Sequence, residues 1–161
     1  MNIRQCNSVI SNQLSSSPCG TAFKYTNDDY VGNTAHIKVV IAHDDYLTKL
    51  YVVSTTSKSF SAFMHSADID DMYLIEPSEY SELSCDTYVI CSEIEVISMD
   101  DLVGKCVDDL QFFEVKNRVS ESTLNELQGK IVNSQHTIRG YKKIVNNCLG
   151  QCRLVSVDSG I

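Results

Sequence analysis

The sequence predicts an α+β domain, mainly β, in which a small antiparallel barrel or curled sheet carries helical cover near its C-terminal end. One observation is a series of about six short runs rich in Val, Ile and Tyr, joined by short polar connections. A second is that, from residue 120, the apolar residues change from strand-like spacing to the period of a helix. The chain has 161 residues, which is enough for one domain with its own core.

Each strand is expected where β-branched and aromatic residues cluster between turn-forming residues. The pattern of the run Asp86–Ser98 changes near Ser92, which indicates either one bent strand or two strands that meet at a corner. Residues 1–19, rich in Ser, Asn and Gln, are expected to form a loose N-terminal arm, and 20–161 a single domain. The acidic segment Asp100–Asp109 is expected to be a loop. The expected strands are Thr21–Tyr25, His36–Ala42, Lys49–Thr55, Met72–Glu76, Asp86–Ser98 and Phe112–Val115.

A helix is expected from Ser120, whose hydroxyl suits an N-cap and which precedes the acidic Glu121. Three apolar residues then fall on one helical face. A further apolar set either continues this face or forms a second helix, and Arg153–Val157 is a candidate last strand. The two sets are Leu124, Leu127 and Ile131, then Ile138, Tyr141, Ile144 and Val145.

The charge balance limits the partners that we expect. With 13 basic and 21 acidic residues the formal net charge is −8, which disfavours general nucleic-acid binding because that depends on neutralising phosphates. No apolar run is long enough to span a membrane, and the N-terminus shows no apolar signal segment. A cytoplasmic protein without membrane contacts is therefore expected.

The seven cysteines, an odd number without a signal segment, argue against a disulfide framework. The spacing Cys148-x-x-x-Cys152 would suit a metal, and His136 is the nearest further candidate, but no second pair with ligand spacing accompanies it. Reduced thiols that act as small hydrophobic side chains are favoured. The group His43-Asp44-Asp45 has a metal-like composition, but a hairpin loop explains it. No metal and no cofactor is expected.

Five segments, in this order, resemble the MazF/PemK-like toxins of bacterial and plasmid toxin–antitoxin systems. The resemblance covers roughly residues 20 to 135 and rests on the order of the elements, since each motif alone is common in β proteins. The segments are Gly20–Tyr25, His36–Ala42, Tyr51–Thr56 with its Thr-Thr pair, Asp86–Cys91 and Lys116–Leu124.

The resemblance implies an SH3-like barrel, a homodimer, a cognate antitoxin as partner, and metal-independent cleavage of single-stranded RNA. In that reaction the RNA 2′-hydroxyl attacks the adjacent phosphate, so the enzyme needs a base, an acid and cations or donors placed together. By this resemblance the catalytic candidates are His36, Lys38 and Thr55. The substrate-binding candidates are Lys24, Thr56, Ser57, Lys58 and Asp86.

The chain departs from the family at His36, which falls where many members carry a key arginine. Histidine is not a permanent cation but can transfer protons near neutral pH. Either His36 moves protons while Lys38 or Lys24 supplies charge, or the site is degenerate. In the second case the protein acts by binding another protein, as an inhibitor or regulator that a phage or plasmid could carry. A third interpretation is an unrelated β protein in which His36 caps a strand, Lys38 is solvated and Thr55 is a structural strand residue.

Overall fold

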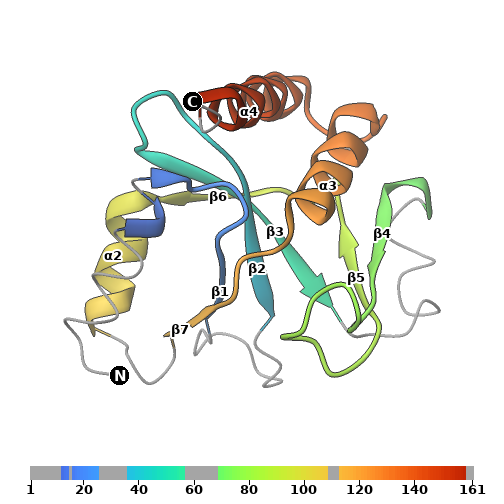
Figure 1. Ribbon diagram of the computed structural model, residues 1–161, viewed down its shortest axis with the longest axis horizontal. Helices are drawn as coiled ribbons and strands as arrows, with labels where there is room; N and C mark the ends of the chain where they lie inside the picture. The colour runs from blue at the N-terminus through green and yellow to red at the C-terminus, as the bar shows by residue number, and fades with distance from the viewer. Residues whose placement is uncertain (1–11, 15, 26–35, 57–68, 109–112, 159–161) are drawn as a thin grey trace.

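The computed structural model describes residues 12–14, 16–25, 36–56, 69–108 and 113–158 (Figure 1). Within these ranges the backbone alone is described for residues 25, 103, 105–108, 113 and 150–158.

The centre of the described structure is an antiparallel sheet of seven strands, which confirms the predicted α+β class. Along the sheet the order is β4-β5-β3-β2-β1-β7, and β6 pairs with β3 outside this path. The strands are β1 (Ala22–Tyr25), β2 (Ile37–His43), β3 (Lys49–Thr56), β4 (Met72–Ile75), β5 (Thr87–Ile90), β6 (Glu95–Ser98) and β7 (Phe113–Lys116).

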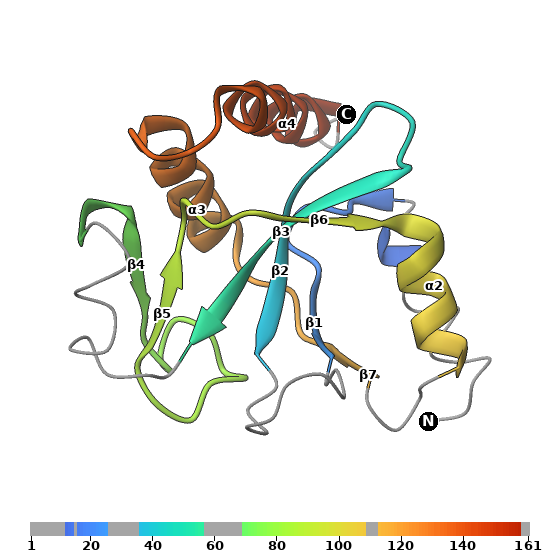
Figure 2. The ribbon, with the colours of Figure 1, turned by 180° about the vertical axis from the view of Figure 1, so that it is seen from behind.

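Strand β3 is shared by two parts of the sheet. Along one edge it pairs with β2, and along the other edge its first half pairs with β6 and its end with β5. Figures 1 and 2 show β3 crossing the middle of the molecule between these partners. The run Asp86–Ser98 is therefore two strands, separated by a turn at residues 91–94, and this is one of the two alternatives that the change of pattern indicated.

Residues 12–14 and 16 are helical, the longer helices are α2, α3 and α4, and two expectations are wrong. The helix α3 (Glu121–Asn133) begins after Ser120, whose hydroxyl accepts a hydrogen bond from the Thr123 N–H, as predicted for an N-cap. The second helix is separate, α4 (Arg139–Asp158), and it includes the segment expected as a last strand, Arg153–Val157. The expected loop Asp100–Asp109 lies almost entirely within α2 (Met99–Asp108).

The helix α2 is stabilised by the position of its acidic residues and by the packing of its apolar residues. Asp100 and Asp101 lie in its first turn, where the helix dipole stabilises negative charge. Met99 and Leu102, spaced by three residues, face the protein, and Leu102 is buried. Gly104 inside the helix is tolerated at a cost of about 1 kcal/mol relative to Ala.

Both faces of the sheet are covered. The larger core lies between one face and the helices α3 and α4, and includes Val39, Val53, Leu127, Ile131 and Val145. The smaller core lies on the other face beneath α2, and it includes Phe23, Val40, Leu50, Val52 and Leu102 together with Leu14. Leu14 belongs to the expected N-terminal arm, so the described part of that arm packs against the sheet.

The turn between β2 and β3 is organised by Asp44. Its carboxylate accepts hydrogen bonds from the backbone N–H groups of Thr48, at 2.7 Å, and Lys49, at 2.9 Å, and from the Thr48 hydroxyl. Desolvation opposes ionisation, but these hydrogen bonds outweigh it and hold the pKa of Asp44 below the ordinary 3.8. The predicted hairpin turn thus depends on one carboxylate.

We expect Asp44→Ala to lower the free energy of unfolding at pH 7 by about 1 kcal/mol, because it removes this local set of hydrogen bonds. Because the pKa of Asp44 is depressed on folding, its contribution is present above pH 3.8 and is lost as pH falls below that value. Urea unfolding of both proteins at several pH values measures the difference. Asp45→Ala, at an exposed neighbour, is the control, and equal losses in the two variants would contradict the assignment.

Candidate functional site

The described candidates of the predicted RNA site gather at one end of the sheet. This is the end where β1 and β3 finish and β2 and β5 begin, at the bottom of Figure 1. Ser57 and Lys58 follow β3 and lie outside the described residues. The other candidates at this end are Lys24, His36, Lys38, Thr55, Thr56 and Asp86.

The register divides these candidates between the two faces of the sheet. Lys38 lies opposite Ser54 on β3, so these two side chains share a face. Thr55 is the next residue on β3 and therefore points to the other face. Lys24 lies opposite Ile37 and belongs to the same face as Thr55. The sheet thus separates Lys38 from Thr55 although both lie at the same end.

Lys38 makes polar contacts within the sheet. Its ammonium group donates to the Ser54 hydroxyl, at 3.1 Å, and forms an ion pair with the carboxylate of Glu95 on β6. The Lys38 side chain is 19% exposed and that of Glu95 is 52% exposed. The positive charge of Lys38 is therefore partly balanced by a carboxylate that solvent can reach.

Thr55 has a structural contact. It is 4% exposed, and its hydroxyl oxygen accepts a hydrogen bond from the Ile37 backbone N–H at 3.1 Å. Thr56 is half-buried and, two residues from Ser54, lies on the face that carries Lys38. Of the Thr-Thr pair, Thr56 is thus the residue beside Lys38, while Thr55 joins β3 to the start of β2.

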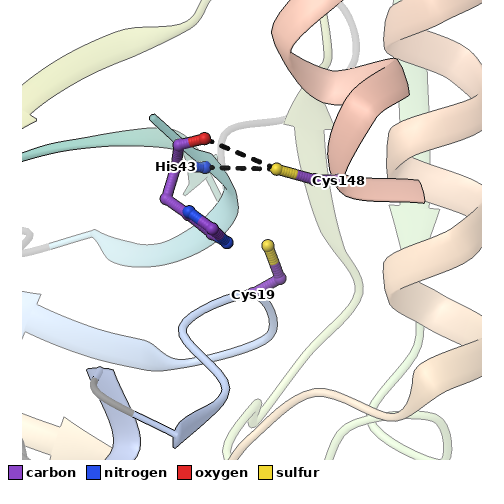
Figure 3. A group of neighbouring side chains, drawn as sticks. All are labelled: Cys19, His43 and Cys148. Atoms are coloured by element: carbon purple, nitrogen blue, oxygen red, sulfur yellow. Dashed lines mark hydrogen bonds between the residues drawn. The ribbon is translucent and has the colours of Figure 1, made fainter. Parts of the chain in front are cut away.

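A second group of reactive side chains lies at the opposite end of the sheet. Cys19 precedes β1, His43 ends β2, and Cys148 lies on α4 (Figure 3). One donor atom from each of the three residues lies within 4.8 Å of the other two. Cys19 and Cys148 are buried, and His43 is half-buried. We call these three residues the Cys–His cluster.

The Cys148 thiol contacts the backbone of His43 on both sides. Its sulfur accepts from the His43 N–H at 3.4 Å and lies 3.5 Å from the His43 carbonyl oxygen, to which the thiol donates. A hydrogen bond with Cys19 contributes most to lowering the pKa of Cys148, to about 6, against the opposing effect of burial. By contrast, burial raises the pKa of Cys91, in the main core, to about 12.

The Cys–His cluster is not the metal pair that the sequence spacing indicated. His136, the further candidate considered with Cys148, places Nδ1 at 2.7 Å from the Asp71 carboxylate, beside a cleft of about 530 Å³ along α3. The side chain of Cys152 lies outside the description. Sequence reasoning missed Cys19 and His43 as a pair because they meet Cys148 only through the fold, and His43 had a sufficient explanation as a turn residue.

Within the residues that the structure describes, no helix combines the length and apolar character needed to cross a membrane. Comparison of the sequence with models of protein families and with curated proteins finds no match in either case.

Proposed function

We propose that this chain is a PemK/MazF-like endoribonuclease that cleaves single-stranded RNA without a metal ion. The observation that carries the proposal is that six candidate residues, from β1, β2, β3 and the start of β5, lie at one end of the sheet, although Lys24 and Thr55 are on the face opposite to Lys38. Residues from positions 24 to 86 in the chain are brought to one end by antiparallel pairing alone.

The chemistry would be divided among these residues. His36, directly before β2, would transfer the proton of the attacking 2′-hydroxyl or of the leaving oxygen. Lys38, the second residue of β2, would supply positive charge to the phosphorane. Thr56, on the same face of the sheet as Lys38, would donate a hydrogen bond to a phosphate oxygen. Thr55, buried against Ile37, would hold β2 and β3 in register at the site.

The finer features of the family belong to the same proposal. Strand β3 changes partner along one edge, from β6 to β5, and this supports a curled sheet of the SH3-like barrel type. The proposal also includes a homodimer, an antitoxin that neutralises the enzyme and action in the cytoplasm.

A second function is favoured by a specific observation. The ion pair between Lys38 and Glu95 reduces the positive charge that RNA would meet, in a protein whose net charge is already −8. On this alternative the same end of the sheet is a degenerate site, and the protein acts by binding another protein.

The test is induced expression in bacteria, with growth and total RNA integrity followed together. We expect growth arrest and RNA cleavage with the wild-type protein, and cleavage reduced at least about 100-fold by His36→Ala, since general acid–base groups contribute that much or more. His136→Ala is the matched control, because His136 is bonded to Asp71 away from this end. Its cleavage should equal that of the wild type.

A further variant distinguishes the two functions. Glu95→Gln removes the carboxylate that pairs with Lys38 and should preserve or increase RNA cleavage. Intact RNA and normal growth with folded, well-expressed wild-type protein would overturn the nuclease proposal and leave the binding module. Cleavage that is unchanged in His36→Ala would overturn the role of His36.

A further inference from the structure

The geometry points to a zinc-binding site formed by Cys19, His43 and Cys148, at the end of the sheet opposite the proposed RNA site. Cys148 lies more than a hundred positions from both Cys19 and His43 in sequence, and the three residues come from three different segments of the fold. Two thiolates and one imidazole are the ligand types that zinc prefers.

The distances suit a small four-coordinate ion. The three donor atoms already lie within 4.8 Å of one another. In a tetrahedral zinc site, bond lengths of about 2.3 Å to sulfur and 2.0 Å to nitrogen place the donors about 3.5–3.8 Å apart. Closing the cluster around the ion therefore requires movements of about 1 Å, which small side-chain rotations supply.

The orientation of His43 supports a ligand role. Its Nδ1 lies 2.9 Å from the Asp44 carbonyl oxygen. A carbonyl can only accept, so Nδ1 carries the proton and the lone pair of neutral His43 is on Nε2. Figure 3 shows the far end of the ring directed toward the Cys19 sulfur. A backbone carbonyl is one of the usual partners that orient the imidazole of a metal-binding histidine.

The surroundings of the two sulfurs also suit a metal. Cys19 is 5% exposed and Cys148 is 2% exposed, so neither thiolate would be solvated, and a bound cation would compensate both charges. The His43 N–H points at the Cys148 sulfur, as backbone donors do toward metal thiolates.

The described residues offer three donors, which leaves one tetrahedral position for a solvent molecule. On binding, the two thiols release their protons to solvent and two sulfur–zinc bonds and one nitrogen–zinc bond form. The ion would tie α4 to the end of β2 and to the segment before β1. Zinc should therefore raise the melting temperature of the protein.

The test uses the full chain, purified in reduced and metal-free form and titrated with Co²⁺ as a spectroscopic substitute for Zn²⁺. We expect one Co²⁺ per chain, with thiolate-to-cobalt charge-transfer bands and the intense visible bands of a tetrahedral site. Added Zn²⁺ should remove these bands, and Zn²⁺ alone should raise the melting temperature.

Three variants each remove one donor of the cluster, and a fourth variant serves as control. Cys19→Ser and Cys148→Ser should weaken binding at least tenfold and abolish the rise in melting temperature. His43→Ala, which leaves both thiols in place, should weaken binding while retaining charge-transfer bands. Cys85→Ser, at an exposed cysteine outside the cluster, should behave as the wild type. Circular dichroism verifies that each variant is folded.

Two results would overturn the site. One is the absence of thiolate-to-cobalt charge-transfer bands in the fully reduced wild-type protein. This result overturns the site whether or not mass spectrometry shows that the purified chain carried a Cys19–Cys148 disulfide before reduction. The other is metal binding that is equally strong in wild type, Cys19→Ser and Cys148→Ser. Neither result depends on RNA cleavage, so the zinc site and the nuclease can fail separately.

Discussion

Ile131→Ala is expected to lower the free energy of unfolding by about 2–5 kcal/mol, because Ile131 lies on α3 with its side chain fully buried in the main core. The substitution removes apolar contact area and leaves a cavity between the helix and the sheet. The neighbouring Leu127 and Val145 are themselves fully buried, so they cannot move far to fill it. Equilibrium unfolding in urea, followed by circular dichroism, measures the loss.

The matched control is Ile138→Ala, the same change at a residue that is 64% exposed just before α4. It should alter the free energy of unfolding by no more than about 0.5 kcal/mol. Losses of similar size in the two variants would show that α3 does not cover the sheet as described. The pair therefore tests the packing of the helical layer without reference to any function.

The strands could be predicted because their sequences contain local signals. Val39, Val40 and Ile41 form an uninterrupted apolar run, and a strand covered on both faces requires this pattern. Ser120 and the helical spacing of the apolar residues after it likewise predicted α3. The helix α2 was missed because acidic residues and a glycine are typical of loops, and the packing of Leu102 against the second face of the sheet is a tertiary effect.

For the RNA-site candidates, the sequence predicts which residues of one strand share a face, but not which residues of neighbouring strands lie opposite each other. Alternation along a strand indicates which residues share a face with Lys38 on β2. It does not indicate which residue of β3 lies opposite, because register depends on the turn and on the whole hydrophobic pattern. The observed register sets Lys38 against Ser54, and this assigns Thr56, rather than Thr55, to the face of Lys38.

The Cys–His cluster could not be predicted from spacing. Cys148 and Cys152 have a recognisable separation, but Cys19 and His43 carry no sequence relation to them. They meet because Gly20, next to Cys19, donates its N–H to the carbonyl oxygen of Val40 in β2, while α4 packs against the same strand and places Cys148 at His43. Only the topology joins these three residues.

Arg118→Ala is expected to lower the free energy of unfolding by about 1–3 kcal/mol, because one guanidinium group holds the segment before β1. It donates to the carbonyl oxygens of Ser17, at 2.7 Å, and Cys19, at 2.6 Å, and to the Thr21 hydroxyl at 3.2 Å. Gly20 lies in the left-handed region, with φ +92°, and a Cβ there would lie 3.2 Å from the Arg118 guanidinium. The close approach of the segment before β1 to the Arg118 guanidinium thus depends on Gly20 as well as on Arg118.

Arg118→Lys separates charge from geometry. Lysine keeps the charge but lacks the planar fork that reaches both carbonyl oxygens, so it should restore only part of the lost stability. Arg139→Ala, at an exposed arginine that begins α4, is the control and should cost less than about 0.5 kcal/mol. In Arg118→Ala the amides of Gly20 and Val119, which bond to Val40 and Gly20, should exchange hydrogen faster than in the control. Unchanged exchange at both amides would mean that the backbone bonds hold this segment without Arg118, and the position of Cys19 would then be set by the sheet alone.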